Sequence, residues 1–172
     1  MSPAGDSESP HRAGLVALLG RPNAGKSSLL NRLVGEKLAI VSPKAQTTRG
    51  RLLGVVTRPN AQILLHDTPG LHSGERQFNK LLCERALETA RDADLRVLLF
   101  EADATWSEAE ERVAVLPPPL LLVRTKCDLA NPGPVVGAER FARVVETSAT
   151  TGKGIEALLE ARKRLDRHVP PR

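Results

Sequence analysis

The feature that most constrains this chain is an apolar run that ends in a glycine-rich segment and continues directly into a helical pattern. The run GLVALLG occupies residues 14–20, the segment GRPNAGKS residues 20–27 and the pattern SSLLNRLVG residues 27–35. An apolar run without alternation is typical of a parallel strand that is buried on both faces. The third segment places its leucines on one helical face. A strand, a loop and a helix in this order predict an α/β domain with residues 14–20 as its central strand.

The glycine-rich segment has the spacing of a phosphate-binding loop. Two glycines separated by four residues and followed by Lys26 and Ser27 let backbone N–H groups and the positive end of a helix converge on a phosphate. The ammonium of Lys26 would neutralise β- and γ-phosphate oxygens, and the hydroxyl of Ser27 would ligate Mg²⁺. A flexible turn between strand and helix is the alternative. The expected phosphate-binding residues are Asn23, Ala24, Gly25, Lys26, Ser27 and Ser28.

From residue 13 onward, short apolar runs alternate with segments of helical period. The runs RLLGVV (51–56) and AQILLHD (61–67) are separated by the turn TRPN (57–60), so we expect them to pair as an antiparallel hairpin. The other predicted strands are 94–102, 120–126 and 142–149, and the other predicted helices are 78–93 and 153–168. The pattern predicts a mostly parallel six-stranded sheet with one antiparallel strand and helices on both faces.

A second motif, HDTPG (66–70), follows the apolar end of a predicted strand. An acid at Asp67 suits a grip on Mg²⁺ through water, and Gly70 can donate an unobstructed backbone N–H to a γ-phosphate. An ordinary Asp between strand and turn is the alternative. The position of Asp67 downstream of the phosphate loop favours the metal role.

Two later motifs have the chemistry of a guanine site. TKCD (125–128) ends a predicted strand, and the carboxylate of Asp128 can accept two hydrogen bonds from the N1 and N2 edge of guanine, which adenine does not offer. The alkyl stem of Lys126 would lie along the base. ETSATTGKG (146–154) follows the next strand, and the backbone N–H of Ala149 could meet guanine O6. The expected base-binding residues are Thr125, Lys126, Asp128, Ser148, Ala149 and Thr150.

Each motif falls at the carboxyl end of a predicted strand, where open parallel sheets bind their ligands. The segment SPKAQTTRG (42–50) lies between the first helix and the second strand, a natural place for a mobile loop. One threonine there would complete the Mg²⁺ shell with its hydroxyl and bond the γ-phosphate through its backbone. The distance from the following strand favours Thr48, with Thr47 as the alternative. The predicted metal residues are Ser27, Thr48 and Asp67, and the predicted catalytic residues are Lys26, Thr48 and Gly70.

Composition argues against several other classes of protein. The 172 residues, 41% of them hydrophobic, suffice for one domain with its own core. Three Phe, one Trp and no Tyr argue against a module that stacks unpaired bases on aromatic rings. Cys83 and Cys127 have neither metal-ligand nor redox spacing, which indicates a reducing compartment. Cys127 is expected to be a packed residue, with a redox switch as the alternative.

Charge and hydropathy give weaker information about partners. The net charge of +5 comes from scattered residues, so a solvated surface is favoured over a nucleic-acid or membrane contact. No apolar stretch approaches the roughly 20 residues that a bilayer requires. Residues 1–12 mix Pro, Ser, Gly and acids without the apolar centre of a signal peptide, so we expect a flexible tail. The expected protein is a cytoplasmic monomer, with peripheral contact at a membrane surface as the alternative.

The motifs GRPNAGKSSLLN, SPKAQTTRG, DTPGLH, TKCD and SAT, in this order across residues 14–167, resemble the GTPase domain of the bacterial Era family, in the translation-factor-related class. QTTRG with DTPGLH distinguishes this pattern from the tRNA-modification GTPase, which usually has GTTRD and DTAG. The resemblance implies a Ras-like P-loop fold over residues 13–168 and hydrolysis of GTP to GDP and phosphate with Mg²⁺. It also implies a role in small ribosomal subunit assembly, with that subunit or its RNA as a partner.

Three departures from the family pattern carry expectations of their own. Era proteins continue into an RNA-binding KH domain, and residues 169–172 stand where its linker would begin, so we expect a GTPase domain without that KH domain. Thr125 replaces the usual Asn of the base motif, which should lower affinity while Asp128 keeps the guanine preference. Segments 104–120 and 129–141 are shorter than in the family and contain prolines, which predicts short or irregular peripheral helices.

The residue after DTPG gives rise to competing hypotheses. Leu71 stands where many signalling GTPases have a glutamine that orients the attacking water. The first hypothesis is slow intrinsic hydrolysis, helped by a K⁺ ion that Asn23 holds in the place of an arginine finger, since relatives with this Asn are stimulated by K⁺. A turn residue is the alternative for Asn23. The second hypothesis is a binding switch in which turnover serves only as a reset, and the third is a fragment that binds GTP without turnover.

Overall fold

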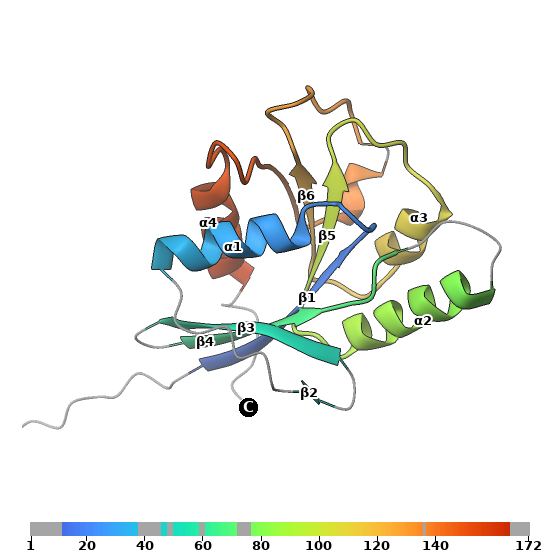
Figure 1. Cartoon of the computed structure of the whole chain (residues 1–172), viewed down its shortest axis with the longest axis horizontal. Helices are drawn as coiled ribbons and strands as arrows, with labels where there is room; N and C mark the ends of the chain where they lie inside the picture. Colours follow the sequence, from blue (N-terminus) through green and yellow to red (C-terminus); the bar gives the residue numbers. More distant parts are fainter. Residues whose placement is uncertain are drawn as a thin grey trace, which may run out of the picture.

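The computed structural model describes residues 12–37, 46–47, 50–58, 61–71, 77–135 and 137–165. Strands and helices alternate along most of this part of the chain (Figure 1). In chain order the elements are β1 (Arg12–Gly20), α1 (Lys26–Lys37), β2 (Gln46–Thr47), β3 (Gly50–Arg58), β4 (Ala61–Asp67), α2 (Gln77–Arg91), β5 (Leu95–Glu101), α3 (Glu108–Ala114), β6 (Leu120–Thr125), the 3-10 helix η1 (Ala138–Arg140), β7 (Arg143–Glu146) and α4 (Ile155–Leu165).

The strands form one sheet in the order β2-β3-β4-β1-β5-β6-β7. Strands β4, β1, β5, β6 and β7 are mutually parallel, whereas β3 pairs antiparallel with β4 and β2 pairs antiparallel with β3. The central position predicted for β1 is confirmed. The prediction of six strands with one antiparallel strand is wrong, because the described residues form seven strands with two antiparallel pairings. The sequence could not predict β2, since two polar residues give no periodic pattern.

The predicted hairpin is present at one side of the sheet. Arg58 at the end of β3 pairs with Ala61 at the start of β4, so a short turn reverses the chain. The register between these strands shifts between Leu52 and Gly54, which marks an irregularity in the ladder. The other predicted strands and helices agree with the structure to within about three residues at each end.

Helices cover both faces of the sheet (Figure 1). Helices α1 and α4 pack on one face, in a core that includes Val16 and Leu18 of β1. Helices α2 and α3 pack on the other, in a core that includes Ala17 and Leu19. Because successive side chains of a strand point to opposite faces, an uninterrupted apolar run is what a strand covered on both sides requires. The α/β class with helices on both faces is confirmed.

The carboxyl ends of the parallel strands align along one edge of the sheet. Leu18 near the end of β1 pairs with Asp67, the last residue of β4. Glu101, the last residue of β5, pairs with Thr125, the last residue of β6. The phosphate-loop, HDTPG and TKCD motifs therefore leave the sheet at the same edge. Open α/β sheets bind their ligands at this edge, where the parallel strands end.

The peripheral helices are short, as predicted. Helix α3 has 7 residues and η1 has 3. The side chain of Ser107 accepts a hydrogen bond from the Ala109 N–H and forms a capping box with Glu110, which fixes the start of α3. Prolines at positions 117–119 follow shortly after the end of α3 and cannot continue a helix.

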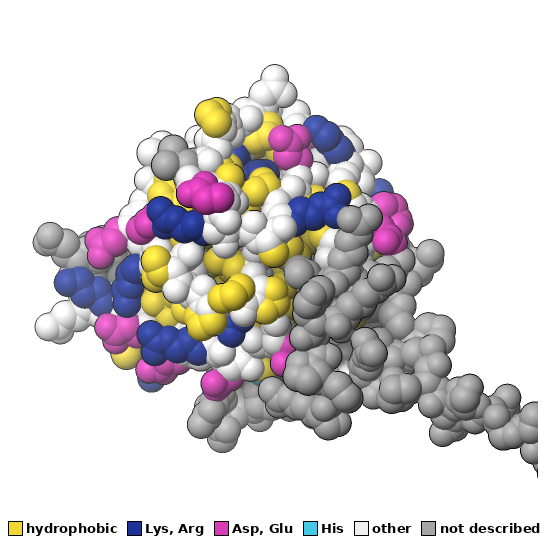
Figure 2. Space-filling model, turned by 180° about the vertical axis from the view of Figure 1, so that it is seen from behind, with side chains coloured by type: hydrophobic (Ala, Val, Ile, Leu, Met, Phe, Trp, Pro, Cys, Tyr) yellow, Lys and Arg dark blue, Asp and Glu magenta, His cyan; other side chains and the backbone are white. Residues whose placement is uncertain are grey.

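The surface of the described part of the chain carries interleaved charges. On the face in Figure 2, Lys and Arg side chains lie among Asp and Glu side chains, in agreement with the scattered charge expected from the sequence. None of the helices that the structure describes is long and apolar enough to cross a membrane. Of the predicted tail, only Arg12 is described, and it begins β1; residues 169–172 lie outside the described part.

Candidate nucleotide-binding site

The loop between β1 and α1 has a backbone that few residue types tolerate. Asn23 has a φ of 66° and Gly25 a φ of 92°, both in the left-handed region that asparagine and glycine adopt at lowest cost. At Gly20, an added Cβ would lie 3.0 Å from the carbonyl oxygen of Leu99 in β5. The loop can therefore turn this close to β5 only with a glycine at its start.

The predicted phosphate-binding side chains gather where α1 begins. Lys26 is the first residue of α1, and its Nζ lies 3.1 Å from the Thr68 carbonyl oxygen and 3.5 Å from that of Gly20. Ser27 and Ser28 follow in the first turn and are exposed. The ammonium thus sits between the phosphate loop and the HDTPG segment, at the positive end of a helix that favours anions.

The HDTPG segment is docked against the phosphate loop. The Leu71 N–H donates to the Gly20 carbonyl at 2.8 Å. A Cβ added to Gly70 would lie 3.0 Å from Cγ of Pro22, so a larger residue would push the two segments apart. Leu71 is fully buried, which agrees with the expectation that it does not orient a catalytic water. The contact places the backbone of Gly70 beside the phosphate loop.

The TKCD motif is tied to both ends of the candidate site. Thr125 Oγ1 donates to the Ala24 carbonyl at 2.8 Å, so the hydroxyl that replaces the family's Asn still bonds to the phosphate loop. Lys126 has a φ of 58°, and its Nζ lies 2.7 Å from Oε2 of Glu101. Asp128 is exposed at the edge of the sheet. The motif therefore combines the exposed carboxylate of Asp128 with Lys126, whose ammonium group is held by Glu101.

Cys127 is a packed residue within this motif. Its side chain is buried, its Sγ lies 3.4 Å from the Arg124 carbonyl oxygen, and its backbone N–H donates to the Thr147 carbonyl at 3.1 Å. Burial raises the pKa of the thiol, which lowers its reactivity at neutral pH. The burial of the side chain agrees with the expected packing role. The backbone hydrogen bond to Thr147 joins TKCD to the next loop.

The ETSAT loop is shaped by its own hydrogen bonds. Ser148 is fully buried, and its Oγ accepts from the Thr151 N–H at 3.1 Å. Gly154 has a φ of 75°, and an added Cβ would overlap the carbonyl group of Glu146 in β7. The hydroxyl of Ser148, one of the predicted base-binding residues, is therefore part of the hydrogen bonding that shapes this loop. The adjacent Ala149 is half-buried at the surface.

Hydrogen bonds between distant segments join the four motifs into one site. They run from Lys26 to Thr68, from Leu71 to Gly20, from Thr125 to Ala24 and from Cys127 to Thr147. Each connects segments that the sequence places far apart. The structure thus brings the predicted phosphate and base residues of these motifs to one edge of the sheet.

Three predicted metal or switch side chains are not described. Thr48 lies outside the described residues. The backbone of Thr47 belongs to β2 and that of Asp67 ends β4, but their side chains are outside the described part. The choice between Thr48 and Thr47 stays a prediction.

The chemistry of the predicted ligands fits Mg²⁺. Ser27 is exposed in the first turn of α1, and the last residue of β4 is an aspartate, whose backbone is paired in register with Leu18 near the end of β1. Hydroxyl and carboxylate oxygens are the ligands that this hard cation prefers. Within the described residues no cluster of three His, Cys, Asp or Glu suggests any other metal site.

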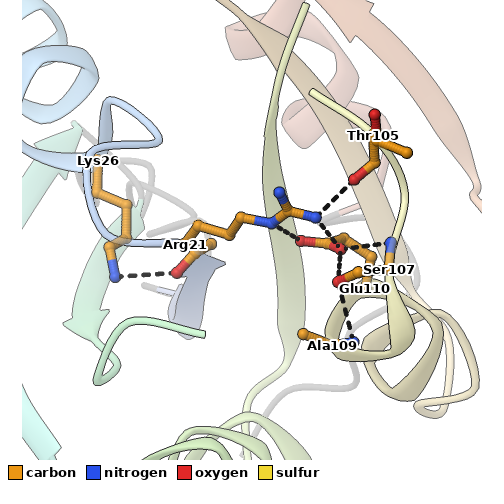
Figure 3. A network of polar contacts seen from close by, with 7 residues as sticks. Arg21, Lys26, Thr105, Ser107, Ala109 and Glu110 are labelled. Atoms are coloured by element: carbon orange, nitrogen blue, oxygen red, sulfur yellow. Dashed lines mark hydrogen bonds and ion pairs between the residues drawn. The ribbon is translucent and has the colours of Figure 1, made fainter. Parts of the chain in front are cut away.

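One ion pair beside the phosphate loop, between Arg21 and Glu110, was not predicted from the sequence. Arg21 Nε and Nη2 lie 2.7 Å from Oε1 and Oε2 of Glu110, and Arg21 Nη2 lies 2.6 Å from the Thr105 carbonyl oxygen (Figure 3). Burial raises the pKa of Glu110, but hydrogen bonds from Arg21 and Ser107 outweigh it and hold that pKa below its ordinary value. The spacing S-x-x-E at residues 107–110 signals a capping box, but nothing in it signals Arg21.

The fold and the motifs define the class of protein. A parallel sheet flanked by helices, a phosphate loop and a TKxD motif at the same edge are those of a Ras-like P-loop GTPase. The family model described as "50S ribosome-binding GTPase" matches residues 15–126. The chain belongs to this family.

Curated relatives place the similarity more narrowly. GTPase Era of Geobacter metallireducens is 42% identical over 165 residues, which are 90% of this chain and 55% of the relative. GTPase Era of Lacticaseibacillus paracasei is 38% identical over 164 residues, which are 89% of this chain and 55% of the relative. The resemblance to the Era GTPase domain is confirmed. The chain spans about half the length of these relatives.

Solved structures agree with this assignment. Era in complex with MgGDPNP and nucleotides 1506–1542 of 16S ribosomal RNA has a TM-score of 0.68 at 31% identity, over 94% of this chain and 58% of that one. The G domain of the Thermotoga maritima FeoB iron transporter has a TM-score of 0.63 at 27% identity, over 89% of this chain and 98% of that one. Both support the Ras-like architecture.

Proposed function

We propose that this chain is a GTP-binding switch that hydrolyses GTP to GDP and phosphate. The observation that carries the proposal is the 2.8 Å hydrogen bond from Thr125 of the base motif to Ala24 of the phosphate loop. It fixes the distance between the part of the site suited to phosphates and the part suited to guanine. A single nucleotide would therefore occupy both parts at once.

The predicted site residues have separate roles in this reaction. Lys26 neutralises the β- and γ-phosphate oxygens, and the N–H of Gly70 orients the γ-phosphate. Ser27, Asp67 and Thr48 would hold Mg²⁺, which supplies positive charge against the charge that develops on the transferred phosphoryl group. Because Leu71 is buried and apolar, no side chain at that position orients the water, so intrinsic turnover is slow.

A K⁺ ion at Asn23 is part of the same proposal. Asn23 is exposed in the phosphate loop, and its left-handed backbone is one that asparagine adopts at low cost. The Asn23→Gly variant keeps this backbone at low cost and removes only the amide. We expect hydrolysis to be faster in KCl than in NaCl for the native chain and equal in the two salts for Asn23→Gly.

The partner is proposed from the relatives. Era was crystallised with 16S ribosomal RNA, and this chain resembles its GTPase domain, so we propose a cytoplasmic role in small ribosomal subunit assembly. The test is co-sedimentation of the chain with purified small subunits in GDP and in a non-hydrolysable GTP analogue. Binding that depends on the nucleotide supports the role, and no binding in either state contradicts it.

The GTPase proposal is tested by calorimetric titration with GTP, GDP and ATP in Mg²⁺, followed by phosphate release. We expect guanine nucleotides to bind and ATP to fail, with slow but measurable phosphate release from GTP. Guanine binding with no release above the uncatalysed rate would favour the alternative, a binding switch without efficient turnover. Equal binding of ATP would contradict the proposal.

A further inference from the structure

Arg21 directs its side chain away from the nucleotide site. It is the first residue after β1, inside the phosphate loop, and its guanidinium reaches Glu110 of α3 on the side opposite Lys26 (Figure 3). The guanidinium also lies 5.9 Å from the ring centroid of Phe100. The side chain of this loop residue is therefore held by the neighbouring layer of the fold.

Glu110 is unusually well fixed for an acidic residue. It is fully buried, and its Oε2 accepts from Arg21 Nη2 at 2.7 Å, from the Ser107 N–H at 2.9 Å and from Ser107 Oγ at 2.6 Å. Its Oε1 accepts from Arg21 Nε at 2.7 Å. A two-point contact of this kind sets the direction of the guanidinium as well as its position.

The backbone on either side of Arg21 is what holds the phosphate loop in shape. The Gly20 carbonyl, directly before it, accepts from Lys26 Nζ and from the Leu71 N–H. The Arg21 carbonyl accepts from the Ala24 N–H at 3.1 Å and closes the turn. Fixing the Arg21 side chain therefore fixes the two peptide groups that position Lys26, Leu71 and Ala24.

We infer that Glu110 is a positioning residue for nucleotide binding, which acts by holding Arg21 and through it the phosphate loop. The inference rests on the proposed function, since it concerns the affinity of that site. Glu110 touches no part of the candidate ligand. It acts from α3, so the phosphate loop is preformed for the nucleotide only while the start of α3 is ordered.

The test compares variants of the same helix. Glu110→Gln keeps the shape of the side chain and removes its charge. Glu111→Gln makes the same change at an exposed residue that pairs with Arg140. Val113→Ala removes buried methyl groups at the other end of α3 and leaves the Arg21–Glu110 and Ser107–Glu110 contacts in place, so it matches the loss of stability. Each variant is titrated with Mg·GDP and assayed for GTP hydrolysis, and its thermal midpoint is measured.

We expect Glu110→Gln to weaken Mg·GDP binding and raise KM about tenfold, with kcat within about twofold, because a misplaced loop loses uniform binding. Glu111→Gln and Val113→Ala should change affinity less than about twofold, because neither side chain contacts Arg21 or Glu110. The double variant Arg21→Gln with Glu110→Gln, in which two amides can still pair, should recover part of the affinity lost in Arg21→Gln.

The outcomes separate this inference from the proposed function. If Glu110→Gln binds Mg·GDP as tightly as Glu111→Gln while its thermal midpoint falls, Glu110 is only structural and the inference is overturned. Equal losses in Glu110→Gln and Val113→Ala overturn it as well, because the effect then comes from α3 stability. If the native chain itself fails to bind guanine nucleotides, the proposed function fails instead.

Discussion

The phosphate end of the site is shaped mainly by backbone groups, whereas the TKCD part of its base end is held mainly by side chains. At the phosphate end, Asn23 and Gly25 supply left-handed turns, Gly20 allows the close approach to β5, and Lys26 adds an ammonium group. At the base end, charged and hydroxyl side chains of TKCD make the contacts that hold the motif. The two ends should therefore fail in different ways when residues change.

The largest effect is expected where the base end depends on its backbone. Gly154→Ala would place a Cβ on the carbonyl of Glu146 at a φ of 75° and should lower the free energy of unfolding by about 3 kcal/mol. Gly14→Ala is the matched control, since nothing lies within 4 Å of a Cβ there. The measurement is urea unfolding of both variants. Similar losses in the two would contradict this account of the ETSAT loop.

The next effect concerns the ammonium group of Lys26 at the phosphate end. Lys26→Ala should weaken Mg·GTP binding about a hundredfold, because a charge-assisted contact to the β- and γ-oxygens is lost. Lys80→Ala, an exposed change on α2, serves as the control and should bind like the native chain. The measurement is fluorescence titration with a labelled GTP analogue. A loss of less than about threefold in Lys26→Ala would remove Lys26 from the site.

A smaller effect tests the link between the two ends. Thr125→Val removes the hydroxyl that bonds to Ala24 and leaves a buried carbonyl unsatisfied, at a cost of about 1–3 kcal/mol. Thr125→Ser keeps the hydroxyl and should lose less. Thermal unfolding with and without GDP measures both the stability of each variant and the rise in its thermal midpoint when GDP binds. Equal behaviour of the two variants would mean that the link contributes nothing.

The smallest effect is expected at the partly exposed ion pair between Lys126 of the TKCD motif and Glu101. Glu101→Gln releases the end of Lys126, whose side chain remains 36% exposed in the pair, so the contribution is at most about 1 kcal/mol. GDP affinity should fall by a factor of about two to five. Glu111→Gln, which loosens the exposed pair with Arg140 outside the base motifs, is the control. A fall in affinity that is equal in both variants would show that Lys126 needs no anchor.

The phosphate end was far easier to predict from sequence than the contacts that support it. Local signals give β1, the loop and α1, because an apolar run, two glycines and a helical period follow each other within residues 14–35. Most strands are predictable for the same reason. The two-residue strand β2 is not, since it is defined only by its pairing with β3.

Contacts between distant residues could not be predicted in this way. Arg21 and Glu110 are separated by 89 positions, and Thr125 and Ala24 by 101. Arginine in a loop and glutamate on a short helix are ordinary surface residues by composition, and only the packing of α3 beside the phosphate loop buries Glu110 and half-buries Arg21. Sequence reasoning identifies the residues that would touch the nucleotide and misses those that position them.

The most direct test of the central claim, a guanine site at TKCD, is a nucleotide titration of Asp128→Asn with GTP and XTP. The carboxylate accepts two hydrogen bonds from guanine, whereas an amide offers one acceptor and one donor, which suits xanthine. The exposed Asp103→Asn is the control. The account predicts that Asp128→Asn prefers XTP while the control and the native chain prefer GTP. An unchanged preference for GTP in Asp128→Asn would contradict it.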